Sequence, residues 1–152
     1  MSVKSESRNR LDAVRLELRR HCDSGADCAP EKLDALMFRV DFEHYAAHER
    51  SLSGAVYVRG ERGPIPVAST ASDARVTIDL SSGEAAAIRR IARESRDTSV
   101  EQAQAWCRAH PGWRLAAAGE EIPYAAAFLN TDPPSPAETE HASALVRTGR
   151  CA

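Results

Sequence analysis

The segment from Pro30 to Glu49 constrains the fold more than any other, because it combines helical spacing with apolar residues on two faces. Proline suits the first turn of a helix, where no backbone N–H donor is needed, so Pro30 predicts the helix start. One face of the helical wheel holds Leu33, Leu36, Met37, Val40 and His44, and a second stripe holds Phe38, Phe42 and Tyr45. A helix that is apolar over so much of its circumference is usually buried on two sides. We therefore expect it to be the central element.

Three polar residues in this segment, Asp41, His44 and His48, have two interpretations. They have the spacing of metal ligands, because imidazoles four residues apart on a helix can converge on zinc. However, His44 lacks the adjacent glutamate that a metalloprotease helix needs, and no glycine-marked turn supplies a further ligand. The alternative is a polar core in which Asp41 and His44 are buried and hydrogen-bonded, since an unpaired buried polar group costs about 1–3 kcal/mol. We predict this polar core, with no metal and no other cofactor.

The flanking segments predict a helix before the central one and a hairpin after it. Leu11, Val14 and Leu18 form one stripe of an amphipathic helix. Residues 55–59 (AVYVR) alternate and are rich in β-favouring residues, which is typical of a strand. Residues 76–80 (VTIDL) alternate in the same way, so we expect them to be the partner strand. A two-stranded hairpin is marginal alone and must pack against the helices.

The second half of the chain predicts a series of short helices. Ser81 with Glu84, and Ser99 with Gln102, have the spacing of capping boxes, in which each side chain satisfies a free N–H at a helix start. Pro111-Gly112 is expected to end the second of these helices, and residues 122–129 (IPYAAAFL) form a last short helix or turn. The predicted fold class is mainly α (α+β): a compact helical domain around one central helix with a small two-stranded β-hairpin.

Length, charge and local composition bound the domain organisation. The 152 residues suit one domain, which we place at residues 10–130, after a flexible N-terminus at 1–9. Residues 131–152 are proline-rich and polar, and we expect most of this tail to be disordered. The net charge of −2 and the pI near 6.2 lack the basic footprint of a dedicated nucleic-acid binder.

Cysteine usage and hydropathy predict a location. The 4 cysteines are widely spaced with no C-x-x-C pair, so we expect free thiols. No stretch approaches the roughly 18 apolar residues of a membrane span, and the N-terminus lacks the apolar stretch of a secretory signal. We therefore expect a cytoplasmic protein with no membrane partner.

Several motifs, in order along the chain, resemble one known family. Residues 32–66, KLDALMFRVDFEHYAAHERSLSGAVYVRGERGPIP, are similar to the opening of the Panacea domain, the SocA-like antitoxin family. The motifs of that opening match Lys32-Leu33, Asp41 with His44, Ser53-Gly54, Tyr57-Val58 and Gly63-Pro64-Ile65-Pro66. The family's closing segment resembles Trp113-Arg114, Gly119-Glu120 and Ile122-Pro123-Tyr124. The resemblance covers residues 10–130, and the order of the motifs makes it more specific than any one of them.

The resemblance implies an antitoxin of a bacterial or phage toxin–antitoxin system, prophages included, which neutralises a cognate toxin encoded by an adjacent gene. Members of the family pair with unrelated toxins, including small alarmone synthetases, and at least one is an adaptor that presents its toxin to a Clp-type protease. The resemblance implies no catalytic residues, and the chain has neither a G-x-S-x-G motif nor a glycine-rich phosphate loop, so we expect no enzyme. A DNA-binding autoregulator is the rival interpretation, although no helix-turn-helix with a basic recognition helix is evident. A homo-oligomer or a hetero-oligomer is compatible with these functions.

The motif Gly63-Pro64-Ile65-Pro66 is expected to form a stiff corner. Each proline fixes its own φ and keeps the residue before it extended. In one interpretation the corner is structural, with Ile65 packed inward. In the other, the corner presents a set of residues to the toxin, because a preorganised loop binds at lower entropic cost. That predicted partner-binding set is Arg59, Arg62, Pro64, Ile65 and Pro66.

Overall fold

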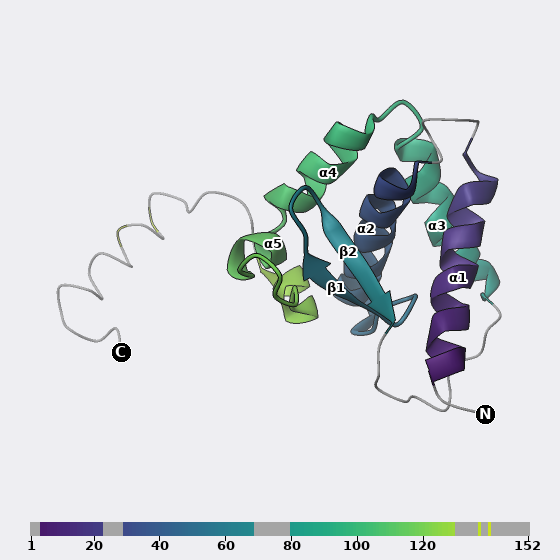
Figure 1. The fold of residues 1–152 in the computed structure, drawn as a ribbon, viewed down its shortest axis with the longest axis horizontal. Helices are drawn as coiled ribbons and strands as arrows, with labels where there is room; N and C mark the ends of the chain where they lie inside the picture. The colour runs from purple at the N-terminus through teal and green to yellow at the C-terminus, as the bar shows by residue number, and fades with distance from the viewer. Residues whose placement is uncertain (1–3, 23–28, 69–79, 130–136, 138–139, 141–152) are drawn as a thin grey trace.

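The helix α2 (Pro30–His48) lies at the centre of the fold, as the sequence predicts (Figure 1). The computed structural model describes residues 4–22, 29–68, 80–129, 137 and 140. The other elements are α1 (Lys4–Arg20), β1 (Ala55–Arg59), β2 (Pro64–Ala68), α3 (Ser82–Glu94), α4 (Val100–Ala109), α5 (Pro111–Leu115) and the 3-10 helix η2 (Tyr124–Phe128). The described chain is mainly helical with one two-stranded antiparallel sheet, so the predicted fold class is confirmed.

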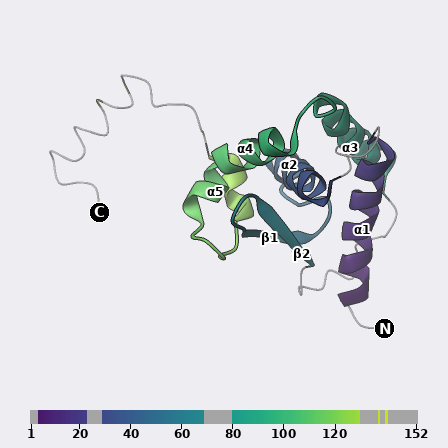
Figure 2. The ribbon, with the colours of Figure 1, turned by 45° about the horizontal axis from the view of Figure 1, so that its top comes forward.

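Most of the circumference of α2 is covered by other elements. The helices α1, α3, α4 and η2 and the strand β2 all contact it. Figure 2, in which α2 is seen closer to end-on, shows the helices and the hairpin arranged around it. Both predicted apolar stripes of α2 are buried except at their last residues, His44 and Tyr45, which are half-buried.

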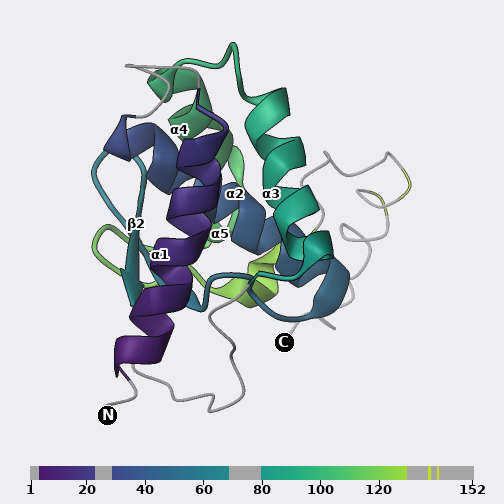
Figure 3. The same ribbon diagram turned by 90° about the vertical axis from the view of Figure 1, so that its right-hand side faces the viewer.

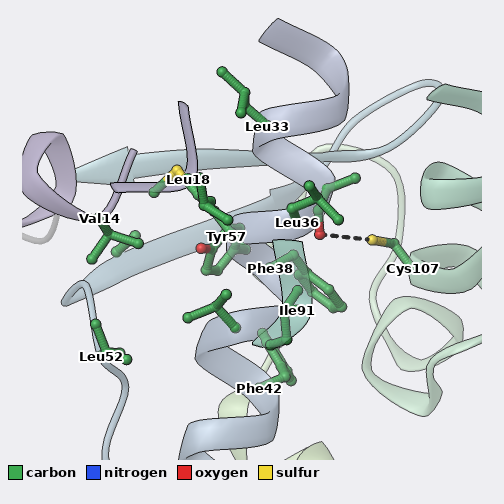
Figure 4. Packing of buried hydrophobic residues seen from close by; sticks show 14 of the residues in the cluster. Val14, Leu18, Leu33, Leu36, Phe38, Phe42, Leu52, Tyr57, Ile91 and Cys107 are labelled. Atoms are coloured by element: carbon green, nitrogen blue, oxygen red, sulfur yellow. Dashed lines mark hydrogen bonds between the residues drawn. The ribbon is translucent and has the colours of Figure 1, made fainter. Parts of the chain in front are cut away.

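An aromatic cluster joins α2 to the hairpin inside the core (Figure 4). The ring of Phe38 stacks on Phe42 with centroids 4.1 Å apart, and the edge of Tyr57 meets Phe38 at 5.3 Å. On the side of α4, the thiol of Cys107 donates to the carbonyl of Ala35 over 3.4 Å. Ala35 and Cys107 are both buried, so this bond lies inside the core between α2 and α4.

The helices α1 and α3 lie side by side (Figure 3). Arg10 of α1 forms an ion pair with Glu84 at the start of α3, and its Nε donates to the carbonyl of Leu52 over 2.7 Å. The helix α1 begins at Lys4, so helical structure starts before the expected domain boundary at residue 10.

The strand that pairs with β1 is β2, so the predicted pairing of 55–59 with 76–80 is wrong. Residues 76–79 lie outside the described ranges. The prolines of β2 suggest a corner, but a strand in an antiparallel ladder donates to its partner only at alternate residues. The N–H of Gly60 donates to the carbonyl of Gly63 over 3.1 Å, which places Pro64 and Pro66 at positions where no N–H is needed toward β1.

A second segment flanks β1 on its other edge. The N–H of Arg59 donates to the carbonyl of Glu120 over 2.9 Å, and the N–H of Ile122 donates to the carbonyl of Tyr57 over 2.7 Å. An isolated bridge joins Val58 to Glu121. The strand β1 therefore lies between β2 and this segment, with both edges hydrogen-bonded.

The expected helix starts in the second half are present. Complete capping boxes join Ser81 to Glu84 and Ser99 to Gln102. The helix α4 ends at Ala109, directly before Pro111-Gly112, as predicted. Pro111 also begins α5, because the Nδ1 of His110 accepts from the N–H of Gly112 over 3.1 Å and caps a new turn. A Cβ at residue 112 would lie 2.8 Å from Ile122, so this position needs glycine for close approach.

Two further sequence expectations concern cysteine and the membrane. Cys22 and Cys107 are free thiols, whereas Cys28 and Cys151 lie outside the described ranges. Among the helices that the structure describes, none has the length and apolar character to cross a lipid bilayer. The expected disorder at 131–152 falls outside the described ranges, except for residues 137 and 140.

The central position of α2 generates a first prediction. Phe38→Ala removes the ring that joins α2 to the hairpin and leaves a cavity, so the free energy of unfolding is expected to fall by about 3–5 kcal/mol. Leu16→Ala is the matched control, because Leu16 is 49% exposed and its truncation is expected to change stability by less than about 0.5 kcal/mol. Urea denaturation measures both, and equal losses in the two variants would contradict the central role of the ring.

Candidate functional site

The outer face of the hairpin carries a cluster of four aliphatic side chains. Residues paired across an antiparallel ladder lie on the same face of the sheet, and the register pairs Val56 with Val67 and Val58 with Ile65. Val56 and Val58 are half-buried, whereas Ile65 and Val67 are 51% and 46% exposed. We call these four residues the hairpin patch. Contiguous apolar side chains at a surface are typical of the centre of a protein-binding site.

The opposite face of the hairpin is buried, and this burial orients the patch. Ala55 and Tyr57 are 1% and 0% exposed, and Pro64 is buried on β2. Successive side chains of a strand point to opposite faces. Because Tyr57 points into the core, its neighbours Val56 and Val58 must point outward.

A buried carboxylate holds the chain that enters the hairpin. Asp41 is 0% exposed, and its Oδ1 accepts from the N–H groups of Leu52 and Ser53 over 2.8 and 2.7 Å. Its Oδ2 accepts from the hydroxyls of Ser53 and Tyr57 over 2.5 and 2.6 Å. The prediction that Asp41 is buried and hydrogen-bonded is confirmed. One side chain of α2 thus fixes both the turn before β1 and the inward position of Tyr57.

His44 does not belong to this buried group, so the prediction that it is buried is wrong, whereas the prediction that it is hydrogen-bonded is confirmed. Its ring is half-buried, and its Nδ1 lies 2.7 Å from the carbonyl oxygen of Arg50. The reason is position, because α2 ends at His48 and its last turns are less covered than its middle.

The structure does not assemble the metal site considered for this helix. Both carboxylate oxygens of Asp41 already accept from protein donors, while His48 is exposed and its ring centroid lies 4.5 Å from that of His44. In the described part of the chain, no group of three or more His, Cys, Asp or Glu side chains is arranged to hold a metal ion. Burial raises the pKa of the Cys107 thiol, which keeps that group in its protonated, unreactive form.

The predicted partner-binding residues fall into two groups. The guanidinium of Arg59 lies 4.9 Å from the ring centroid of Trp113 and donates to the carbonyls of Trp113 and Ala116 over 3.1 and 2.7 Å, so Arg59 holds α5 against the hairpin. Pro64 is buried and also serves the fold.

The other three members of that set lie at the surface. Arg62 is exposed, Pro66 is half-buried and Ile65 is 51% exposed. The interpretation with Ile65 packed inward is therefore wrong. The carbonyl of Arg62 accepts from Arg108 over 2.6 Å, which ties the turn between the strands to α4. This turn is anchored, so the exposed side chains next to it are presented from a fixed backbone.

Sequence reasoning missed three members of the hairpin patch: Val56, Val58 and Val67. The alternation in AVYVR contained the signal for the first two, because a strand with one buried face leaves alternate residues outside. Val67 has no such signal, because it follows the prolines of the expected corner and lies in no alternating run of residues.

Comparison with known proteins adds no relative: no family model, no curated protein and no solved structure matches the chain.

The Asp41 network generates a prediction on stability. Asp41→Ala leaves the buried N–H groups of Leu52 and Ser53 without their acceptor, so the free energy of unfolding is expected to fall by about 3 kcal/mol. Asp12→Ala is the control, because Asp12 is an exposed carboxylate on α1. Thermal and urea melts give the comparison, and a loss no larger than that of the control would show that other contacts hold the turn.

The same carboxyl gives a prediction on pH dependence. Burial raises the pKa of Asp41, and the four hydrogen bonds it accepts offset this only in part. As the pH rises above the ordinary aspartate value of about 3.9, the unfolded chain loses a proton that the folded protein still holds. The contribution of Asp41 to the free energy of unfolding is therefore largest below that value and is lost as the pH rises through the raised pKa.

Urea denaturation over this pH interval tests the sign. The free energy of unfolding of the unsubstituted protein, relative to that of Asp41→Asn, is expected to fall as the pH rises. The reason is that only the unsubstituted protein carries the titrating carboxyl. A relative free energy of unfolding that rises with the pH would contradict the raised pKa of Asp41.

Proposed function

We propose that the protein is an antitoxin that neutralises a cognate toxin by direct protein–protein binding, with the hairpin patch at the centre of the interface. The observation that carries this proposal is the pair Ile65 and Val67, two large aliphatic side chains that are exposed on an antiparallel sheet. The resemblance of residues 10–130 to the Panacea domain supports it. We propose that the binding takes place in the cytoplasm of a bacterium, with the partner encoded by an adjacent gene or prophage locus.

The surroundings of the patch suit a protein partner. Stable interfaces have an apolar centre surrounded by charged and polar residues. Glu61 and Arg62 in the turn and Glu121 beside β1 are exposed charged residues at the borders of the patch. We infer that these charges orient the toxin, while the aliphatic centre supplies most of the binding free energy.

Binding by a preformed surface is consistent with neutralisation by occlusion. Asp41, Arg59 and Arg108 hold the hairpin to α2, α5 and α4 through hydrogen bonds. A surface that does not reorganise loses little conformational entropy when the toxin docks.

The adjacent gene provides the direct test. We expect its expression alone to stop growth and co-expression with this protein to restore it. A harmless neighbour, or no rescue of growth, would sink the antitoxin proposal. In that event, a shift of operator DNA by the purified protein would favour the autoregulator, and protease-dependent loss of a co-expressed partner would favour the Clp-type adaptor.

The patch generates its own prediction. Ile65→Asp with Val67→Asp places two charges at the centre of the interface, and toxin binding is expected to weaken by at least about tenfold, equivalent to about 1.4 kcal/mol. Leu16→Asp is the matched control, because Leu16 is an exposed aliphatic residue on α1, outside the hairpin.

Calorimetry measures the affinity, and a thermal melt verifies that each variant is folded. A well-folded double variant with full affinity would exclude the patch as the interface. A large fall in melting temperature, without loss of affinity in the folded fraction, would assign these residues to the fold instead.

A further inference from the structure

A cavity of about 390 Å³ lies between α2, the connection from α3 to α4, and α4 itself. Its apolar floor is formed by Ala35 and Leu36 of α2 and Ala103 of α4, all of which are buried. Trp106 forms a wall and is 37% exposed. The volume is near the lower end of the range for ligand pockets, about 300–1,000 Å³, so the cavity suits a compact group rather than a helix.

The aromatic wall is held in place before anything binds. The guanidinium of Arg39 lies 5.4 Å from the ring centroid of Trp106, and the rings of Phe38 and His110 contact it at 6.4 and 5.9 Å. Arg39 is itself fixed, because its Nε donates to Glu43 over 3.1 Å and its Nη2 pairs with Glu94. A wall that needs no reordering keeps the entropic cost of binding low.

The charges at the mouth argue against an anionic ligand. Arg39 is the arginine that lines the cavity, and it is paired with Glu43 and Glu94, so its positive charge is already matched. Asp97, which lines the cavity, adds a further carboxylate. A phosphate or carboxylate would meet net repulsion here, whereas an uncharged apolar group gains by leaving water for the floor and the wall.

We propose that this cavity receives a bulky apolar side chain, of the leucine, methionine or phenylalanine type, that the toxin presents. It is a second anchoring point, built from different elements than the hairpin patch. Trp106 and Arg39 line the cavity, and Trp and Arg are among the residue types enriched where single side chains carry much of the binding free energy. The identity of the partner rests on the proposed function, but the chemistry of the cavity does not.

The cavity is tested first without the toxin. The chain has 2 tryptophans, so its indole N–H groups give two NMR signals, and Trp106→Phe assigns them. N-acetyl-leucine amide and N-acetyl-phenylalanine amide are expected to shift the Trp106 signal in a saturable way and to leave that of the buried Trp113 in place. N-acetyl-aspartate amide is expected to shift neither. No saturable shift, or equal shifts of both signals, would overturn the proposal.

A plugged cavity then tests the link to the toxin. Thr98 lines the cavity from the α3–α4 connection, and Thr98→Phe is expected to weaken binding of both the probe and the toxin by about tenfold or more. Thr98→Ser leaves the cavity open and is the matched control. A thermal melt checks both variants, and Thr98→Leu replaces the phenylalanine if that variant does not fold.

The outcomes separate the two proposals. If the amide probes bind but the product of the adjacent gene never binds the protein, the antitoxin proposal fails, whereas the cavity is still an apolar binding site. If Thr98→Phe removes probe binding but leaves the toxin affinity unchanged, the toxin does not use the cavity, and the inference is wrong.

Discussion

The hydrogen bonds of Asp41 are the interaction on which the position of the hairpin depends. A carboxylate without water around it is costly to bury, and here that cost is offset by four donors from Leu52, Ser53 and Tyr57. Two of the donors are backbone groups in the turn before β1, and a third is the side chain that β1 sends into the core. The Nε of Arg10 donates to the carbonyl of Leu52, so α1 also holds this turn. The central helix therefore fixes the register and the facing of the hairpin through one polar residue.

That arrangement separates the residues that support the hairpin from those that it exposes. Along β1, Tyr57 points to Asp41, and its two neighbours point away from the core. The same alternation along β2 buries Pro64 and exposes Ile65 and Val67. A change on the outer face thus alters few core contacts, whereas a change on the inner face moves the whole hairpin. This physical separation allows the outer face of the hairpin to vary while the fold is kept.

Sequence patterns predicted the parts of the fold whose signals are local. The apolar stripes of α2, the capping boxes at Ser81 and Ser99, and the buried state of Asp41 follow from spacing and residue type alone. The strand β2 was not predictable in this way, because its prolines favour a corner unless the pairing partner is known. The role of Arg59 depends on the carbonyls of Trp113 in α5 and of Ala116 directly after it, which lie 54 and 57 residues further along the chain. Long-range partners of this kind leave no local signal.

The prolines of β2 also limit how a partner can use the hairpin. One edge of β1 faces β2 and the other faces residues 119–122, so the remaining edge of the sheet belongs to β2. On that edge the backbone groups of Pro64 and Pro66 face away from β1, and proline has no N–H to donate. An added strand would find carbonyl acceptors there but lack the donors that a full ladder requires. The prolines therefore disfavour extension of the sheet at this edge, and the partner that we propose would contact the face of the sheet, where Ile65 and Val67 are exposed.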